Sequence, residues 1–326
     1  MILMARPSPP PGGATDKPLI SVVIPAYNAQ THLAQCLSSV RTQSGDFRLE
    51  TLVVDDGSQD ETAYIARHDP GVQCIVQPNR GPSAARNTGI AAATGEFIAF
   101  LDADDLWPEG KLQAQLTVLR QHPQAALVFG DCRQFNAEGP RSRTEFAVGN
   151  LGEVSWSNSG LVPNAYARLL ENNFITTGSV IVRRKALHEA GGFAEDLRLV
   201  EDLDLWLRIA RRHAIAWCPR ECLHRRLHGS NISRDAQAIS LAYLVVLSRH
   251  AASWGPGDAA ALGVEATRLV SKEELHLAEL AMAQGHARDT WRHLWRGIAS
   301  YPRPASTWRA AKTLLKLGAR SLGLRD

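Results

Sequence analysis

From Leu19 onward, the sequence alternates short, wholly apolar, β-branched runs with stretches of helical composition. The apolar runs predict strands at 19–25, 49–55, 72–77, 97–101 and 125–129, and the stretches between them predict helices at 29–42, 60–68, 82–93 and 108–121. A strand without polar alternation is buried on both faces, which is typical of a mostly parallel sheet covered by helices. The sequence therefore predicts an α/β fold with a mostly parallel central sheet flanked by helices.

The chain beyond this alternation is expected to be more varied. Segment 130–163 is rich in Gly, Asn, Ser and Arg and predicts a loop or small insertion, whereas 177–182 predicts a strand and 201–212 a helix. The spacing i, i+3, i+4, i+7 predicts the core-facing side of that helix. The residues at this spacing are Leu203, Trp206, Leu207 and Ala210.

Three regions are expected along the 326 residues. The Pro- and Gly-rich residues 1–18 predict a disordered leader, and they contain no sustained apolar stretch that would form a signal peptide. Residues 19–234 form the predicted α/β domain. Residues 235–326 predict a helical C-terminal region, with a break at 254–258 and a helical hairpin over 277–302.

The composition argues against a nucleic-acid-binding, disulfide-rich or membrane-spanning protein. A net charge of +3 is too small to indicate nucleic acid as the main partner. Five scattered cysteines argue against a disulfide scaffold and favour a reducing compartment. No apolar run approaches the length of a membrane span. We therefore expect a cytoplasmic protein.

Polar residues follow each of the first four predicted strands. They are "PAYN" at 25–28, "DDGSQD" at 55–60, "PNRG" at 78–81 and "DADD" at 102–105. Ligands of parallel sheets bind beyond the carboxyl ends of the strands. The sequence therefore predicts a nucleotide site at this edge of the sheet.

Three carboxylates end the most apolar strand, "GEFIAFLDADD", at Asp102, Asp104 and Asp105. Residues i and i+2 of an extended segment point the same way, so Asp102 and Asp104 can reach one hard cation. Oxygen ligands suit Mg²⁺ or Mn²⁺, which commonly also bind a substrate phosphate. A metal and a nucleoside diphosphate would neutralise the cluster. On the residues alone, a solvated turn in which Asp105 caps the next helix is an open alternative.

Five motifs in order carry a family resemblance: "SVVIPAYN" (21–28), "VVDDGSQDET" (53–62), "NRGPSAARNTGI" (79–90), "GEFIAFLDADD" (95–105) and "EDLDLWLR" (201–208). The chain resembles family 2 glycosyltransferases of GT-A fold over about residues 19–232. The resemblance implies a metal-dependent enzyme that moves a sugar from a nucleoside-diphosphate-sugar to an acceptor hydroxyl and inverts the anomeric centre. UDP is the expected nucleotide because it is the commonest in the family.

The resemblance also assigns the residues that bind the donor and the metal. Asp104 would bind Mn²⁺ or Mg²⁺ directly, with Asp102 on the metal or its water and His228 as the candidate third ligand. Alternatives stay open, because Pro25 and Asn28 also suit a strand end and a helix cap, and Arg86 also suits an exposed helical position. The expected donor-binding residues are Pro25, Ala26, Tyr27, Asn28, Asp56, Arg86, Asp102 and Ala103.

The "ED" pair at the start of the predicted helix 201–212 resembles the family's catalytic acids. Asp202 would be the base that takes the proton from the acceptor hydroxyl, and Glu201 would orient it or assist. The alternative is that both acids only favour the helix dipole.

A zinc site is a second possible metal site. Its ligands would be Cys218, Cys222, His224 and His228. Their spacing is tight for a zinc site, and an extended chain would spread them over both faces, so we favour the family reading. In that reading His228 lies on a loop that closes over the donor diphosphate.

The family's processive polysaccharide synthases carry a Q-x-x-R-W motif, which this sequence lacks. We therefore expect a non-processive enzyme of surface-polysaccharide or glycolipid assembly, acting on a glycan or lipid-linked glycan. Two alternatives are a sugar-phosphate nucleotidyltransferase, which would need a glycine-rich loop after the first strand, and a nucleotide-sugar-binding module without activity. Intact Asp102, Asp104 and Asp202 argue against the latter.

The C-terminal residues 285–326 hold nine Lys and Arg residues against two Asp, together with Trp291, Trp295 and Trp308. Such basic helices with tryptophans are suited to an anionic membrane surface that carries a lipid-linked acceptor. A solvated helical cap or a homodimer surface is the alternative.

Overall fold

The computed structural model describes residues 17–149, 160–228, 235–261 and 264–302. The expected leader therefore lies outside the described residues except for its last two positions. The same holds for residues 303–326 of the expected helical region and for the segment 229–234 after His228.

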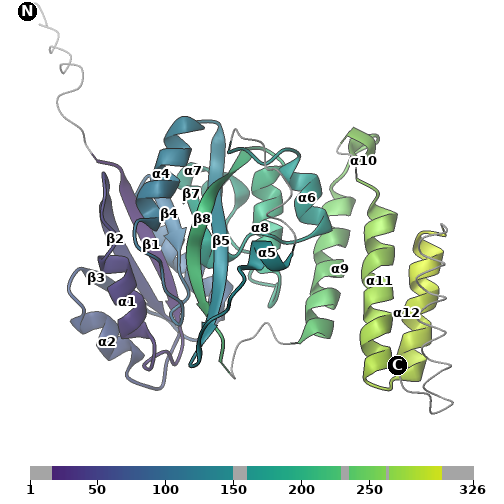
Figure 1. Ribbon diagram of the computed structural model, residues 1–326, viewed down its shortest axis with the longest axis horizontal. Coiled ribbons are helices and arrows are strands. Elements are labelled where there is room, and N and C mark those ends of the chain that lie inside the picture. The colour runs from purple at the N-terminus through teal and green to yellow at the C-terminus, as the bar shows by residue number, and fades with distance from the viewer. Residues whose placement is uncertain (1–16, 150–159, 229–234, 262–263, 303–326) are drawn as a thin grey trace, which may run out of the picture.

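A mixed sheet forms the centre of the protein, in the order β3-β2-β1-β4-β7-β5-β6, with β8 beside β5 (Figure 1). The strands β1 to β4 pair in parallel, β7 is antiparallel to both of its neighbours, and β8 is parallel to β5. The strands are β1 (Leu19–Ala26), β2 (Arg48–Asp55), β3 (Val72–Val76), β4 (Phe97–Phe100), β5 (Ala125–Asn136), β6 (Gly139–Pro140), β7 (Ile181–Arg183) and β8 (Ala214–Arg226). The predicted α/β fold with a mostly parallel sheet is confirmed.

Two apolar layers cover the sheet. Ile20, Val22 and Ile24 of β1 face the layer of α1 and α4, whereas Val23 faces the layer that contains α3, α6, α7 and α8. Burial on both faces is what the unbroken apolar runs indicated. The helices of these layers are α1 (Leu33–Arg41), α2 (Thr62–His68), α3 (Pro82–Ala92), α4 (Lys111–Gln121), α5 (Glu145–Val148), α6 (Ala165–Glu171), α7 (Arg184–Ala190) and α8 (Glu201–Ala210).

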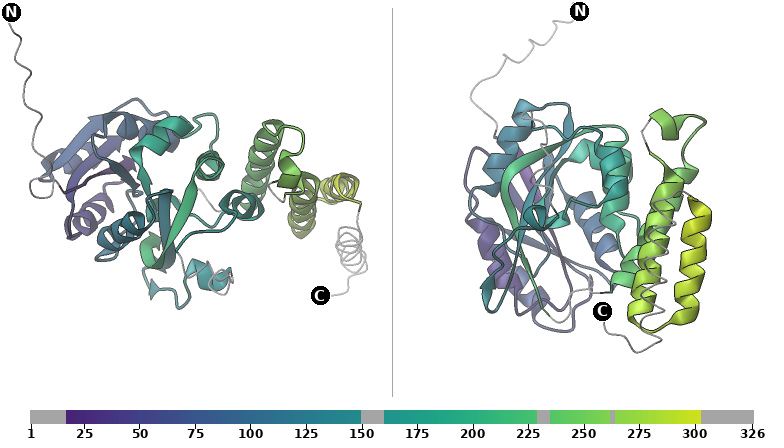
Figure 2. Two further views of the ribbon diagram at one scale, coloured as in Figure 1. Left: turned by 90° about the horizontal axis from the view of Figure 1, so that it is seen from above. Right: turned by 45° about the vertical axis from the view of Figure 1, so that its right-hand side comes forward.

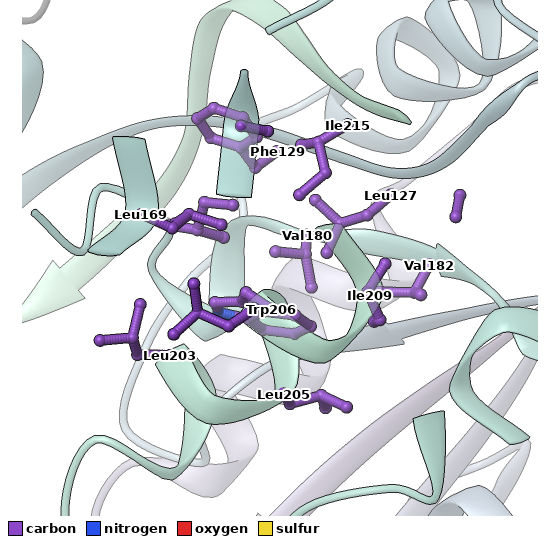
Figure 3. Close-up of a cluster of buried hydrophobic side chains, with 14 of the residues drawn as sticks. Leu127, Phe129, Leu169, Val180, Val182, Leu203, Leu205, Trp206, Ile209 and Ile215 are labelled. Atoms are coloured by element: carbon purple, nitrogen blue, oxygen red, sulfur yellow. The ribbon is translucent and has the colours of Figure 1, made fainter. Parts of the chain in front are cut away.

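Helix α8 is buried more completely than its spacing predicted. Trp206 is fully buried among side chains of β5, β7, α6 and β8 (Figure 3), and the ring of Phe193 meets it edge-on at 6.1 Å. Leu205 and Ile209 are buried as well, whereas Ala210 is only partly so. Packing on several sides fixes the rotation of α8 and hence the direction of the acids in its first turn.

The C-terminal helices α9 (Ala236–Ala252), α10 (Asp258–Ala261), α11 (Ala266–Ala283) and α12 (Ala287–Ser300) lie at one side of the α/β region (Figures 1 and 2). Tyr243 and Val246 of α9 belong to the same apolar cluster as α8, so the boundary at 234–235 stays a prediction. None of the described helices is both long enough and apolar enough to cross a membrane.

Three expectations about elements are corrected. Segment 130–163 does not begin as a loop, because β5 continues to Asn136 by pairing with β8 as far as Arg226. Segment 177–182 is not one strand but a 3₁₀ turn (Thr177–Ser179) followed by β7. The hairpin over 277–302 starts earlier, since α11 begins at Ala266 and turns at Gly285, whose φ is +78°.

Candidate active site

The loop after β1 is tied to the loop after β2. Asn28, with a left-handed φ of +49°, accepts a hydrogen bond from the Gln59 backbone N–H at 2.9 Å, and its own N–H donates to the Ser58 hydroxyl at 2.9 Å. Helix α1 begins only at Leu33, so Asn28 does not cap it. The expected donor-binding stretch begins in the sheet, with Pro25 and Ala26 buried and Tyr27 exposed.

Asp56 is buried at the end of β2 and holds the loop that leads into α3. Its carboxylate accepts hydrogen bonds from the Gln77 side chain at 2.7 Å and from the backbone N–H groups of Arg80 at 3.0 Å and Gly81 at 2.7 Å. Three protein donors therefore already bind the carboxylate of Asp56, an expected donor-binding residue. Asp55 accepts from the Ser58 N–H at 3.3 Å and closes a turn.

Arg86 of α3 is buried and bridges two parts of the site. One guanidinium nitrogen donates to Asp102 at 2.8 Å and another to Glu201 at 2.8 Å, while the guanidinium lies 5.2 Å from the centre of the Phe193 ring. The alternative of an exposed helical arginine is wrong. Arg86 connects the end of β4 to the start of α8, a double pairing that no sequence motif indicated.

The other two carboxylates after β4 have different partners. Asp104 lies 2.7 Å from Nε2 of His228, and Asp105 is buried and accepts the backbone N–H of Arg226 at 2.8 Å. The cap alternative for Asp105 is wrong, because α4 begins only at Lys111. Burial first, and then the neighbouring Asp104 and Asp102, raise the pKa of Asp105 and favour its protonated form. The repulsion within the cluster is therefore reduced even before any ligand binds.

The candidate metal ligands are partly assembled. Asp104 and His228 lie together, but the Asp102 carboxylate is turned towards Arg86, and Ala103 between the two acids is buried. Within the described ranges, no three His, Cys, Asp or Glu side chains form a group that could hold a metal ion.

The residues of the zinc alternative lie in different surroundings. Cys218 and Cys222 are buried in β8, His224 lies 3.4 Å from Glu221, and His228 lies beside Asp104. The two cysteines therefore share one apolar cluster and a hydrogen bond, whereas the two histidines lie beside different acids.

Asp202 has neutral hydrogen-bond donors. One oxygen accepts the Leu203 N–H at 2.7 Å and the Asn173 amide at 3.3 Å, and the other accepts the Thr177 hydroxyl at 3.2 Å. Burial first, and the neighbouring Glu201 second, raise the pKa of Asp202 to about 6. A carboxylate with that pKa is suited to accept a proton near neutral pH.

Asp202 opens onto a cavity of about 260 Å³. The other residues of its lining come mainly from α5, from the segment that leads to the 3₁₀ turn, and from β8. They are Glu145, Phe146, Gly149, Asn172, Asn173, Phe174, Ile175, Thr176 and Arg225. Polar groups among aromatic rings are typical of a ligand site.

Helix α4 and Trp107 of the loop before it support the segment that reaches Asp202. Three consecutive carbonyl groups, those of residues 178–180, accept hydrogen bonds from Trp107 at 2.8 Å, Gln115 at 2.7 Å and Lys111 at 3.3 Å. Burial lowers the pKa of Lys111 to about 7. The backbone next to Thr177 is thereby fixed, and with it the hydroxyl that donates to the acid of α8.

Glu145 is a further site residue that the sequence did not reveal. Its carboxylate accepts from Gln134 at 3.0 Å, Arg225 at 3.1 Å and Thr176 at 3.1 Å. These contacts hold α5 in its position beside the cavity. Glu145 lies in a stretch without a recognisable motif, so no sequence signal could have found it.

Comparisons with known proteins identify the family and the fold. A family model described as glycosyl transferase family 2 matches residues 21–191. The chain is 29% identical over 225 residues to a putative teichuronic acid biosynthesis glycosyltransferase, TuaG, of Bacillus subtilis, which covers 67% of this chain and 83% of that protein. It is 30% identical to an uncharacterised glycosyltransferase of Rickettsia conorii but spans only 36% of that protein's length.

Two solved structures share the fold. TarS residues 1–349 of S. aureus, in complex with UDP-GlcNAc, align with a TM-score of 0.65 at 17% identity, over 94% of this chain and 92% of that one. The mannosyltransferase PcManGT of Pyrobaculum calidifontis, in complex with GDP-Man and Mn²⁺, aligns with a TM-score of 0.58 at 21% identity, over 94% and 88%. The chain therefore belongs to glycosyl transferase family 2 and has a fold of the GT-A type.

Proposed function

We propose that this protein transfers a sugar from a nucleoside-diphosphate-sugar to an acceptor hydroxyl, with inversion of the anomeric centre and release of the product after each transfer. The proposal is carried by the surroundings of Asp202. Asp202 opens onto a cavity, its hydrogen-bond donors are neutral, and its pKa is raised to about 6. An acid that only capped a helix would need neither the cavity nor the raised proton affinity.

The donor is proposed to lie along the carboxyl ends of β1, β2 and β4. The loops that carry Asn28 and Asp56, which hydrogen bonds join, would bind the base and ribose. The end of β4 would bind the diphosphate. Asp56 is fully engaged by protein donors, so its role is to shape this loop rather than to bind by a free carboxylate. Arg86 holds Asp102 in place through their ion pair.

In the proposed reaction, the acceptor oxygen attacks the anomeric carbon from the side of the Asp202 cavity. The bond between that carbon and the phosphate oxygen breaks, and its electron pair leaves with the diphosphate. The acceptor's proton passes to the Asp202 carboxylate. A positioned base of this kind contributes about 10²–10⁴-fold to the rate.

The chemistry of the cluster after β4 fits a divalent cation. Mg²⁺ and Mn²⁺ are commonly held by one or two carboxylates together with substrate phosphates and water. Asp104 and His228 would hold such an ion, with Asp102 on it or on its water, and the diphosphate would complete its ligands. When bound, the ion would stabilise the negative charge that develops on the leaving diphosphate. Mn²⁺ bound with GDP-Man to PcManGT supports a divalent cation here.

UDP is the proposed nucleotide, and a glycan or lipid-linked glycan of a surface polysaccharide or glycolipid is the proposed acceptor. UDP-GlcNAc bound to TarS supports uridine, whereas GDP-Man bound to PcManGT keeps guanosine among the donors to be tested. The name of TuaG supports a role in polysaccharide assembly.

Thermal unfolding against a panel of nucleoside diphosphates and nucleotide-sugars, with and without Mn²⁺, tests the donor site. A ligand at a hundredfold excess over its Kd raises the free energy of unfolding by about 2.7 kcal/mol. We expect stabilisation that depends on both the base and the metal. Asp104→Ala should lose the metal-dependent part, whereas the exposed Asp46→Ala should keep it. No response to any nucleotide would contradict the proposal.

A further inference from the structure

The outer face of α12 carries an exposed stripe of arginines and tryptophans. Trp291 and Trp295 are 48% and 66% exposed, and Arg288, Arg292 and Arg296 beside them are exposed as well. The spacing of three and four residues places all five on one face of the helix. We call these five residues the α12 stripe.

The opposite face of α12 is firmly packed. Leu294 and Gly297 are buried against α11, and the buried His293 lies 2.6 Å from Glu274 of α11. Figures 1 and 2 show α12 as the outermost described helix, on the far side of α11 from the sheet. Packing therefore fixes the stripe outward, although two large aromatic side chains are costly to leave in water.

The charge of the stripe is largely uncompensated. Arg292 has an acidic neighbour, Asp289 at 3.1 Å, whereas no ion pair or side-chain hydrogen bond is found for Arg288 or Arg296 within the residues described. The sequence that follows, 303–326, holds six basic residues and one acidic residue. Neither that segment nor a second copy of the stripe brings the negative charge that the arginines lack. Charge complementarity favours an anionic partner.

We propose that the α12 stripe docks on an anionic lipid surface. Tryptophan is suited to the membrane–water interface because its ring is amphipathic, and arginines beside it reach anionic headgroups. Each arginine near such a surface adds about fivefold to the affinity. Docking of the stripe on lipid does not require the transfer activity.

The test is cosedimentation of the full chain with vesicles of phosphatidylcholine alone or of phosphatidylcholine mixed with phosphatidylglycerol. We expect binding only to the mixed vesicles, weakening as salt is added. Trp291→Ala with Trp295→Ala should weaken binding about tenfold or more. Arg288→Glu with Arg296→Glu should abolish it.

Matched controls are Tyr64→Ala on α2, which removes an equally exposed ring, and Lys185→Glu on α7, which reverses an exposed charge. Both should bind vesicles like the unmodified chain, and thermal unfolding should show that every variant is folded. Equal binding by stripe and control variants would overturn the proposal. So would the absence of vesicle binding together with a dimer that only the tryptophan variants dissociate.

Discussion

The two acidic clusters of the site differ in how their charge is balanced. After β4, the carboxylates of Asp102 and Asp104 meet an arginine and a histidine, and Asp105 meets a backbone N–H. At the start of α8, Asp202 meets only amide and hydroxyl groups, because the nearby Arg86 pairs with Glu201 instead.

This difference separates two kinds of chemistry within one site. Arg86 and His228 hold the carboxylates of Asp102 and Asp104 in place, as a metal and phosphate site requires. Burial without a direct cationic partner raises the proton affinity of Asp202, as a general base requires. Arg86 touches both clusters, so it is the residue through which the separation can be broken.

Asp202→Asn is expected to have the largest effect. Removing the base should lower the rate of transfer by about 10²–10⁴-fold while donor affinity stays near that of the unmodified protein. Release of nucleoside diphosphate measures the first quantity, and ligand-dependent thermal unfolding measures the second. Asp196→Asn, on the exposed loop before α8, is the matched control. A fully active Asp202 variant would show that the base lies elsewhere.

Arg86→Ala should break the separation itself. It leaves Glu201 and Asp102 without their shared cation, and unpairing a buried ion pair costs about 3–5 kcal/mol, with the lower end expected because Asp102 is 39% exposed. Urea unfolding measures the loss of stability. Glu201→Gln in the same chain should restore part of it, because the unpaired acid is then neutral. A loss of unfolding free energy below about 1 kcal/mol would mean that the ion pairs of Arg86 contribute little to stability.

The parallel half of the fold could be predicted from the sequence. Runs such as 97–101 are apolar at every position, and only a strand buried on both faces explains that pattern. The other half could not be predicted in the same way. The strand β5 extends through Asp131 and Arg133 because β8 lies beside it, and a partner at least 88 residues away leaves no local signal.

The residues of the site also include some that could be predicted from the sequence and some that could not. The carboxylates after β4 and the acids of α8 belong to short motifs, so their positions could be predicted. The double pairing of Arg86 depends on bringing α3, β4 and α8 together, and the role of Glu145 depends on α5 folding back over the cavity. These are contacts of tertiary structure, which spacing along the chain does not encode.

The pH dependence of activity should reflect the raised pKa of Asp202. Asp202 accepts a proton only when ionised, and its pKa is raised to about 6, so activity should fall about tenfold per pH unit below that value. The raised pKa also means that ionisation of Asp202 destabilises the fold as the pH rises towards 6. Thermal unfolding should therefore show Asp202→Asn gaining stability over the unmodified protein at neutral pH but not at low pH. A gain that is the same at both pH values would contradict the raised pKa.

The smallest expected effect comes from the hydroxyl that tunes this pKa. Thr177 donates to Asp202 and lowers its pKa, against the larger effect of burial. Thr177→Val keeps the shape of the side chain but removes the donor, so the acid limb of the activity profile should move up by about one pH unit. Thr177→Ser, which keeps the hydroxyl, should leave the limb in place. A limb that moves equally in both variants would mean that the packing of the 3₁₀ turn, rather than the hydrogen bond, sets the proton affinity of Asp202.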